Sequence, residues 1–285
     1  ANDILKSYHF IEEDYIIMRG AEQAAKIALS SRYSLEAEQL IAFAREHELD
    51  GIEYTIQSEA KEDLDREFSN MQKLADSGIE IRYHFQFRKV ELAHKDPEFA
   101  AKSVAYYKDC IDAVNRLGGT HIIVHLCLGY RYKMEEMSFE HARENLKEIV
   151  AYAREKGVTV CLENLTFGYT NTPEQFLSLI QSSGASANID IGHAIASPIV
   201  TEHKISVENF MEQMLPYTVS AHIYNIEVTD EEKRRAYHVC PEKDEDIESR
   251  IKILENSNCS WWLIELGDPE EILKTKKIIE SICSR

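Results

Sequence analysis

One unit recurs eight times along this chain: a short apolar run rich in β-branched residues, separated from the next by a helical pattern. In the helical stretches, such as 99–117 and 139–156, apolar residues recur at i, i+3, i+4 and i+7. The expected strands are 25–30, 51–56, 80–85, 120–126, 158–163, 185–190, 218–223 and 261–266. This alternation, over roughly 260 residues, predicts an α/β protein with a (β/α)8 TIM barrel.

An open, doubly wound sheet is the alternative fold for the same alternation. Such a sheet ordinarily carries a Gly-rich phosphate loop after its first strand. No such loop follows residues 25–30, and no linker rich in Pro, Gly or Ser divides the chain. We therefore expect a single barrel domain over residues 21–285, preceded by an N-terminal extension over residues 1–20.

Charge and composition restrict the classes of partner. The 285 residues include 50 acidic and 32 basic ones, a net charge of −18 that repels phosphate backbones and argues against nucleic acid. No apolar run approaches the ~20 residues that a membrane helix needs, so we expect no membrane association. The six cysteines form no CxxC pair, as expected for reduced thiols in a cytoplasmic protein.

Ionisable residues lie at the ends of the expected strands. Six strands end in or beside a histidine or carboxylate: His84, His125, Glu163, Asp190, His222 and Glu265. In a barrel of this kind the carboxyl ends of the strands share one mouth, so these side chains should converge. Any one of them could be structural. However, burying carboxylates behind runs such as "VTVCL" and "WWLI" costs several kcal/mol without a partner.

The three acidic residues of this set would repel one another strongly. The sequence places no basic residue among the strand ends, so we expect a divalent cation to resolve the conflict. Nitrogen and oxygen donors without a thiolate suit Mn, Zn, Mg or Co.

Four segments in a fixed order carry a family resemblance: "VCLEN" (160–164), "NIDIGHA" (188–194), "SAHIYN" (220–225) and "WLIEL" (262–266). They resemble the xylose isomerase-like barrel superfamily. That group includes sugar isomerases and epimerases, hydroxypyruvate isomerase, inosose dehydratase and endonuclease IV. The resemblance covers roughly residues 25–280 and is strongest between 120 and 266.

The resemblance implies roles for individual residues. The implied ligands of one catalytic metal are Glu163, Asp190, His222 and Glu265. It also implies that Glu163 and Glu265 lie on opposite faces of the substrate, and that His193 contacts a substrate oxygen. His84 and His125 match histidines that, in endonuclease IV, share the equivalent of Glu163 in a second metal site.

The chain departs from the family patterns at two places. The third metal site of endonuclease IV uses a histidine and a later Asp-x-His motif. Here the histidine is His193, but the later motif reads Ala236-Tyr237-His238 and lacks the aspartate. This argues against three-metal phosphodiester chemistry and leaves His238 either near the site or in a solvated helix start. The positive residue that some epimerases carry six positions after the ligand histidine is Val228, which argues against a ketohexose epimerase.

Two further residues are candidate substrate contacts. Asn164 follows Glu163, and a cap of the loop after the strand is its alternative role. Glu53 lies in the second strand, and a local ion pair is its alternative.

These residues lead to two classes of function. The first is a metal-dependent isomerase or epimerase that acts on a small sugar, polyol or hydroxy-keto compound through an enediolate, with paired glutamates as acid and base. An inosose-type dehydratase is a close variant. The second is an endonuclease IV-like phosphodiesterase, with His84 and His125 completing a second metal site. One metal favours the first class, which we predict, and two or three favour the second. Dimers and tetramers are common in the superfamily, so the prediction is compatible with a homo-oligomer.

Overall fold

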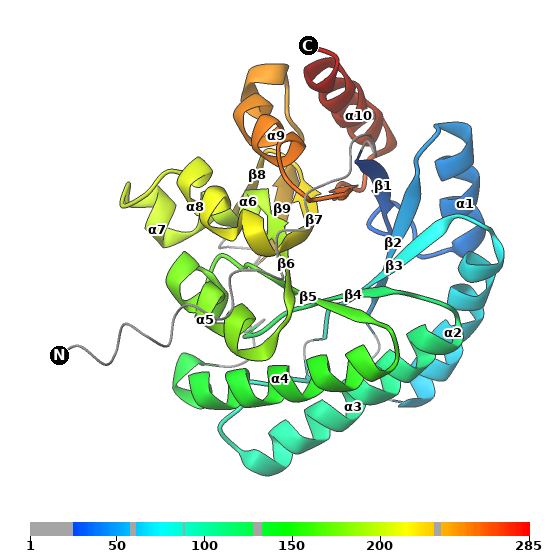
Figure 1. Ribbon diagram of the computed structural model, residues 1–285. Coiled ribbons are helices and arrows are strands. Elements are labelled where there is room, and N and C mark those ends of the chain that lie inside the picture. The colour runs from blue at the N-terminus through cyan, green and yellow to red at the C-terminus, as the bar shows by residue number, and fades with distance from the viewer. Residues whose placement is uncertain (1–24, 58–60, 88, 128–132, 231–234) are drawn as a thin grey trace.

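Eight parallel strands close into a barrel in the order β1-β10-β7-β6-β5-β4-β3-β2 (Figure 1). The structure is a computed structural model that describes residues 25–57, 61–87, 89–127, 133–230 and 235–285. The barrel strands are β1 Lys26–Ser30, β2 Gly51–Ile56, β3 Glu80–Phe85, β4 His121–Val124, β5 Thr159–Glu163, β6 Ser186–Asp190, β7 Thr218–Ile223 and β10 Trp261–Ile264. The predicted single (β/α)8 barrel is confirmed. The predicted N-terminal extension, residues 1–20, lies outside the described residues.

Helices cover the outside of the barrel (Figure 1). They are α1 Ala37–Glu46, α2 Lys61–Asp76, α3 Pro97–Arg116, α4 Phe139–Glu155, α5 Pro173–Ser183, α6 Ile191–Ala196, α7 Pro198–Thr201, α8 Val207–Met214, α9 Glu248–Glu255 and α10 Pro269–Cys283. The Ser138 side chain caps α4 by accepting from the His141 N–H, and Leu146, Ile149 and Ala153 of α4 are buried at helical spacing. None of the helices in the described ranges is long and apolar enough to cross a membrane.

Residues alternate between the two faces of each strand, and this decides which side chains reach the barrel interior. On β3, Tyr83 and Phe85 join the apolar core. Arg82 and His84 face inward, and the Arg82 guanidinium stacks on the ring of Trp261 at 4.4 Å. Trp261 needs Gly51 beside it, because a Cβ there would lie 2.2 Å from the indole. Below its mouth the barrel is therefore filled by side chains.

An antiparallel hairpin follows β7 and was not predicted from the sequence. Its strands are β8 (Ile226–Asp230) and β9 (Arg235–Val239), and it packs beside α6 (Figure 1). In this hairpin Glu227 pairs with His238. The solvated helix start considered for His238 is therefore wrong, since His238 lies within a strand and its side chain is 3% exposed.

Candidate functional site

His222 lies among three carboxylates at the mouth of the barrel. Its Nδ1 is 3.3 Å from Oε2 of Glu163, 3.3 Å from Oε2 of Glu265 and 3.7 Å from Oδ2 of Asp190. Glu163 and Asp190 end β5 and β6, His222 is the last residue but one of β7, and Glu265 directly follows β10. The four strands are consecutive in the barrel, and all four residues are buried. Two donors bound at about 2.1 Å to a tetrahedral cation lie about 3.4 Å apart, so the spacing matches a shared cation.

The polar atoms at the centre of this group lack hydrogen bonds. Within the described part of the chain, His222 Nδ1, Asp190 Oδ2 and Glu265 Oε2 are buried and make none. Burial by itself lowers the pKa of His222, but the carboxylates of Glu163, Glu53 and Glu265 outweigh it and raise that pKa well above its ordinary value. A positive charge is therefore strongly favoured among them. Their donor set fits a divalent cation.

A second group of donors shares Glu163. Oε1 of Glu163 lies 3.2 Å from Nε2 of His125, and Oε2 lies 3.7 Å from Nε2 of His84. The two imidazole Nε2 atoms are 2.9 Å apart. Burial lowers the pKa of His125, which favours the neutral imidazole that a metal requires. The second predicted donor set is thus brought together, with Glu163 between the two groups.

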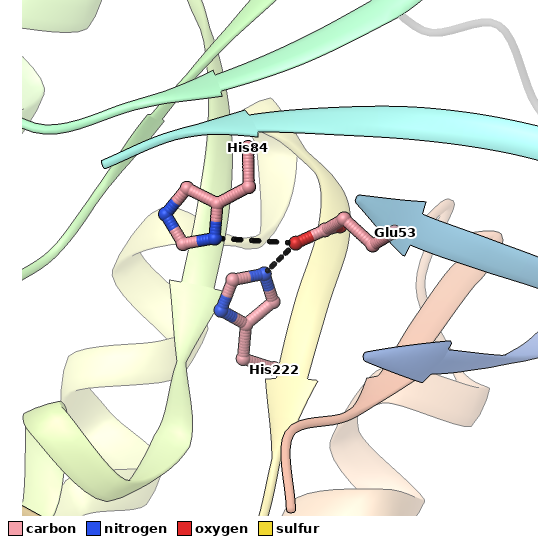
Figure 2. A group of neighbouring side chains, drawn as sticks. All are labelled: Glu53, His84 and His222. Atoms are coloured by element: carbon pink, nitrogen blue, oxygen red, sulfur yellow. Dashed lines mark ion pairs between the residues drawn. The ribbon is translucent and has the colours of Figure 1, made fainter. Parts of the chain in front are cut away.

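Glu53 contacts one histidine of each group, His222 and His84 (Figure 2). Its Oε1 is 2.9 Å from Nε2 of His222 and 3.5 Å from Nδ1 of His84. The Trp261 indole donates to the other oxygen of Glu53 at 3.3 Å. Burial raises the pKa of Glu53, but the two imidazoles outweigh burial and lower it to about 2. Of the two roles considered for Glu53, the structure shows the ion pair.

The two carboxylate oxygens of Asp190 have different partners. Its Oδ1 accepts from the His193 N–H at 2.7 Å, which caps α6, and from the Tyr224 hydroxyl at 2.7 Å. Its Oδ2 is left facing His222. Gly192 makes this possible, since a Cβ there would lie 2.0 Å from the ring of Tyr224.

The Asn164 side chain links the ends of β5 and β6. Its Nδ2 donates to the Asp190 carbonyl at 2.9 Å, and its Oδ1 accepts from the Asp190 N–H at 2.8 Å. These bonds are structural, but they join two strands and do not cap the loop after β5 as considered for Asn164. Its contact with substrate stays a prediction.

Two charged residues at the site were missed from the sequence. The Arg32 Nε donates to Oε1 of Glu265 at 3.0 Å, so the expectation that no basic residue lies near the carboxylates is wrong. Arg32 comes two residues after the end of β1. It is neither a histidine nor a carboxylate, so the pattern of such residues at the strand ends does not include it. Glu227 faces His193 and His238. The alternation in "IEVTD" (226–230) is the signal that would have indicated a strand with Glu227 on one face.

Comparison with known proteins assigns the family. Residues 41–282 match the family described as "Xylose isomerase-like TIM barrel". The chain belongs to this family. Among curated proteins, the xylose isomerase-like chain is 24% identical over 179 residues to the uncharacterized protein MJ0008 of Methanocaldococcus jannaschii, covering 63% of this chain and 73% of that protein.

Solved structures show the same fold. A D-tagatose 3-epimerase-like protein has a TM-score of 0.68 and 20% identity, covering 91% of this chain and 97% of that chain. An L-ribulose 3-epimerase has a TM-score of 0.67 and 16% identity, covering 91% and 96%. Endonuclease IV from Thermus thermophilus has a TM-score of 0.61 and 17% identity, covering 91% and 99%. At these identities the likeness is one of fold.

Proposed function

We propose that this xylose isomerase-like protein is a metal-dependent isomerase or epimerase of a small sugar, polyol or hydroxy-keto compound. The observation that carries the proposal is the ring of three carboxylate oxygens 3.3–3.7 Å from His222 Nδ1. The sugar 3-epimerases among the similar structures give supporting context. A cytoplasmic location and a homo-oligomeric state belong to the same proposal.

A divalent cation (Mn, Zn, Mg or Co) held by Glu163, Asp190, His222 and Glu265 would polarise a substrate carbonyl and its neighbouring hydroxyl. The residues of the chain then move the proton. One of Glu163 and Glu265, as an ionised carboxylate, removes the α-proton to give an enediolate and becomes protonated. The other, starting in its protonated form, gives its proton to the enediolate and is left as a carboxylate. Arg32, His238 and His222 outweigh burial and hold the pKa of Glu265 well below its ordinary value, which keeps this carboxylate ionised. His193, which lies beside Asp190, would bind a substrate oxygen.

The test is turnover of a panel of ketoses, polyols and hydroxy-keto acids in heavy water. Proton transfer through the glutamates places deuterium at the α-carbon of the product. Complete retention of the substrate hydrogen indicates a hydride shift and contradicts the proposed proton transfer. Loss of water from the substrate in the same assay identifies the dehydratase variant.

Phosphoester hydrolysis is the second candidate, and the contacts of His84 and His125 with Glu163 favour it. Two cations bridged by one carboxylate form the clamp that many phosphatases and nucleases use. The net charge of −18 argues against a nucleic-acid substrate. Cleavage of abasic-site DNA or a simple phosphodiester, with no turnover of the carbohydrate panel, would establish this candidate instead.

A further inference from the structure

Asn188 lies in the barrel interior, one layer further from the mouth than the carboxylates around His222. It is on β6, two residues before Asp190, so the two side chains lie on the same face of the strand. The Asn188 side chain is fully buried, and its Nδ2 lies 2.9 Å from Oε2 of Glu163. An ionised carboxylate can only accept, so the amide nitrogen is the donor.

This hydrogen bond holds the oxygen of Glu163 that faces the main site. Oε2 is the oxygen 3.3 Å from Nδ1 of His222, whereas Oε1 lies 3.2 Å from Nε2 of His125. The last torsion of a glutamate side chain is soft, so burial alone does not decide which oxygen faces which group. The imidazoles around Glu163 can change charge or turn toward a cation, but the amide does not titrate. The Asn188 contact is therefore the fixed one.

The pairing of β6 with β7 is irregular at this point. The register shifts immediately before Asn188, which pairs with Ser220. Two residues further on, Asp190 pairs with His222. An extra residue on one strand re-aims the side chains beyond it. The same irregularity thus sets the position of Asn188 and the pairing of Asp190 with His222.

The amide of Asn188 is not the most stable filling for this position. Its Oδ1 is buried and makes no hydrogen bond within the described residues. A buried polar atom without a partner costs free energy that an apolar side chain would not. The other end of the amide donates to a carboxylate, and such a charge-assisted bond is stronger than one between neutral groups. The contact with Glu163, rather than the packing of the barrel, therefore explains an asparagine here.

We propose that Asn188 is a positioning residue for Glu163, and that its amide assigns the two oxygens of this carboxylate to different groups. Oε2 is kept for the cation held with Asp190 and His222, and Oε1 is kept toward His125. The inference rests on the proposed cation site and adds to it a residue that is not a ligand. Loss of the amide should let the carboxylate turn, which weakens the cation site and changes its coordination.

The test compares three forms of the full chain after removal of metal: wild type, Asn188→Ala and Ser220→Ala. Ser220 gives the matched control, because it pairs with Asn188 and its buried hydroxyl makes no hydrogen bond in the described part of the chain. Competition with a chromogenic chelator gives the affinity for Co²⁺, and visible spectra of the Co²⁺ protein without chelator report its coordination. Asn188→Ala should bind Co²⁺ at least ~10-fold more weakly and show a changed spectrum, while Ser220→Ala matches wild type.

Wild-type affinity and an unchanged spectrum in Asn188→Ala would overturn the proposal. A role in folding alone has that outcome, because it lowers the urea midpoint of the metal-free protein and leaves both Co²⁺ readouts unchanged. If Asn188→Ala does not fold, as judged by circular dichroism, Asn188→Val fills more of the space and gives the same comparison. None of these readouts needs a substrate. A carbohydrate panel without turnover would therefore contradict the proposed function, while the Co²⁺ comparison would still decide on Asn188.

Discussion

The Glu53 carboxylate lies 2.9 Å from Nε2 of His222, on the side of the ring opposite the three carboxylates that surround Nδ1. A negative charge at Nε2 favours the tautomer with its proton there, which leaves the Nδ1 lone pair for a cation. The same oxygen lies 3.5 Å from Nδ1 of His84, whose Nε2 faces Glu163. One buried carboxylate thus orients two rings, one in each donor group (Figure 2).

Glu53→Gln should weaken metal binding without removing a ligand. We expect a loss of about 10–100-fold in affinity, as is usual when a partner of a ligand histidine is changed. Competition with a chromogenic chelator measures it. Glu80→Gln is the matched control, since Glu80 lies on a neighbouring barrel strand but at the opposite end from the mouth and pairs with Lys26. Unchanged affinity in Glu53→Gln would show that its contact with His222 has no role in metal binding.

Glu265→Gln and Asp190→Asn should both lose activity, but for different reasons. Glu265→Gln keeps the shape and a ligand oxygen but removes the base, so turnover should fall by at least ~10²-fold at saturating metal. Asp190→Asn weakens the cation site, so excess metal should restore part of its activity. Steady-state kinetics over a range of metal concentrations separates the two. Equal recovery of both variants by metal would argue against acid–base chemistry at Glu265.

Gly192→Ala should disturb Asp190 through Tyr224. The added Cβ would lie 2.0 Å from the tyrosine ring, and an overpacked core site costs about 1–3 kcal/mol of unfolding free energy. Tyr224→Phe is the comparison, because it removes only the 2.7 Å hydrogen bond to Asp190. Urea denaturation should find Gly192→Ala the less stable of the two. The reverse order would show that the ring can move aside.

Stability should fall in mild acid because of His121. Burial first, then the nearby Arg82 charge, lowers the pKa of His121 from 6.5 to about 4. Between these two values the unfolded chain binds a proton that the folded protein does not. The folded protein therefore loses stability as pH falls from 6.5 toward 4. His121→Gln should show a shallower decline in urea midpoint over that range, and equal slopes would contradict the shift.

The barrel could be predicted because its sequence is periodic. Strands β2, β3 and β7 begin and end at the predicted residues, since each is an apolar run closed by a turn or a helix pattern. Convergence of Glu163 and His222 followed from topology alone, because parallel strands in a closed barrel present their carboxyl ends together.

Contacts made outside that repeat could not be predicted in the same way. Glu227 reaches the site only because the β8–β9 hairpin folds back beside α6. This hairpin is not part of the repeating strand–helix unit of the barrel. Arg32 lies 233 residues from Glu265 in the chain. Closure of the barrel between β1 and β10 brings the two together, and no local pattern encodes that pair.

The indole of Trp261 gives the buried site an optical signal. Its N–H donates to Glu53, which in turn contacts His222, so an ion bound at His222 changes the field on that ring. The chain has only two tryptophans, and the other, Trp262, packs in the apolar core. Emission from the unlabelled protein should therefore follow metal loading in real time, giving rates of uptake and release as well as amounts.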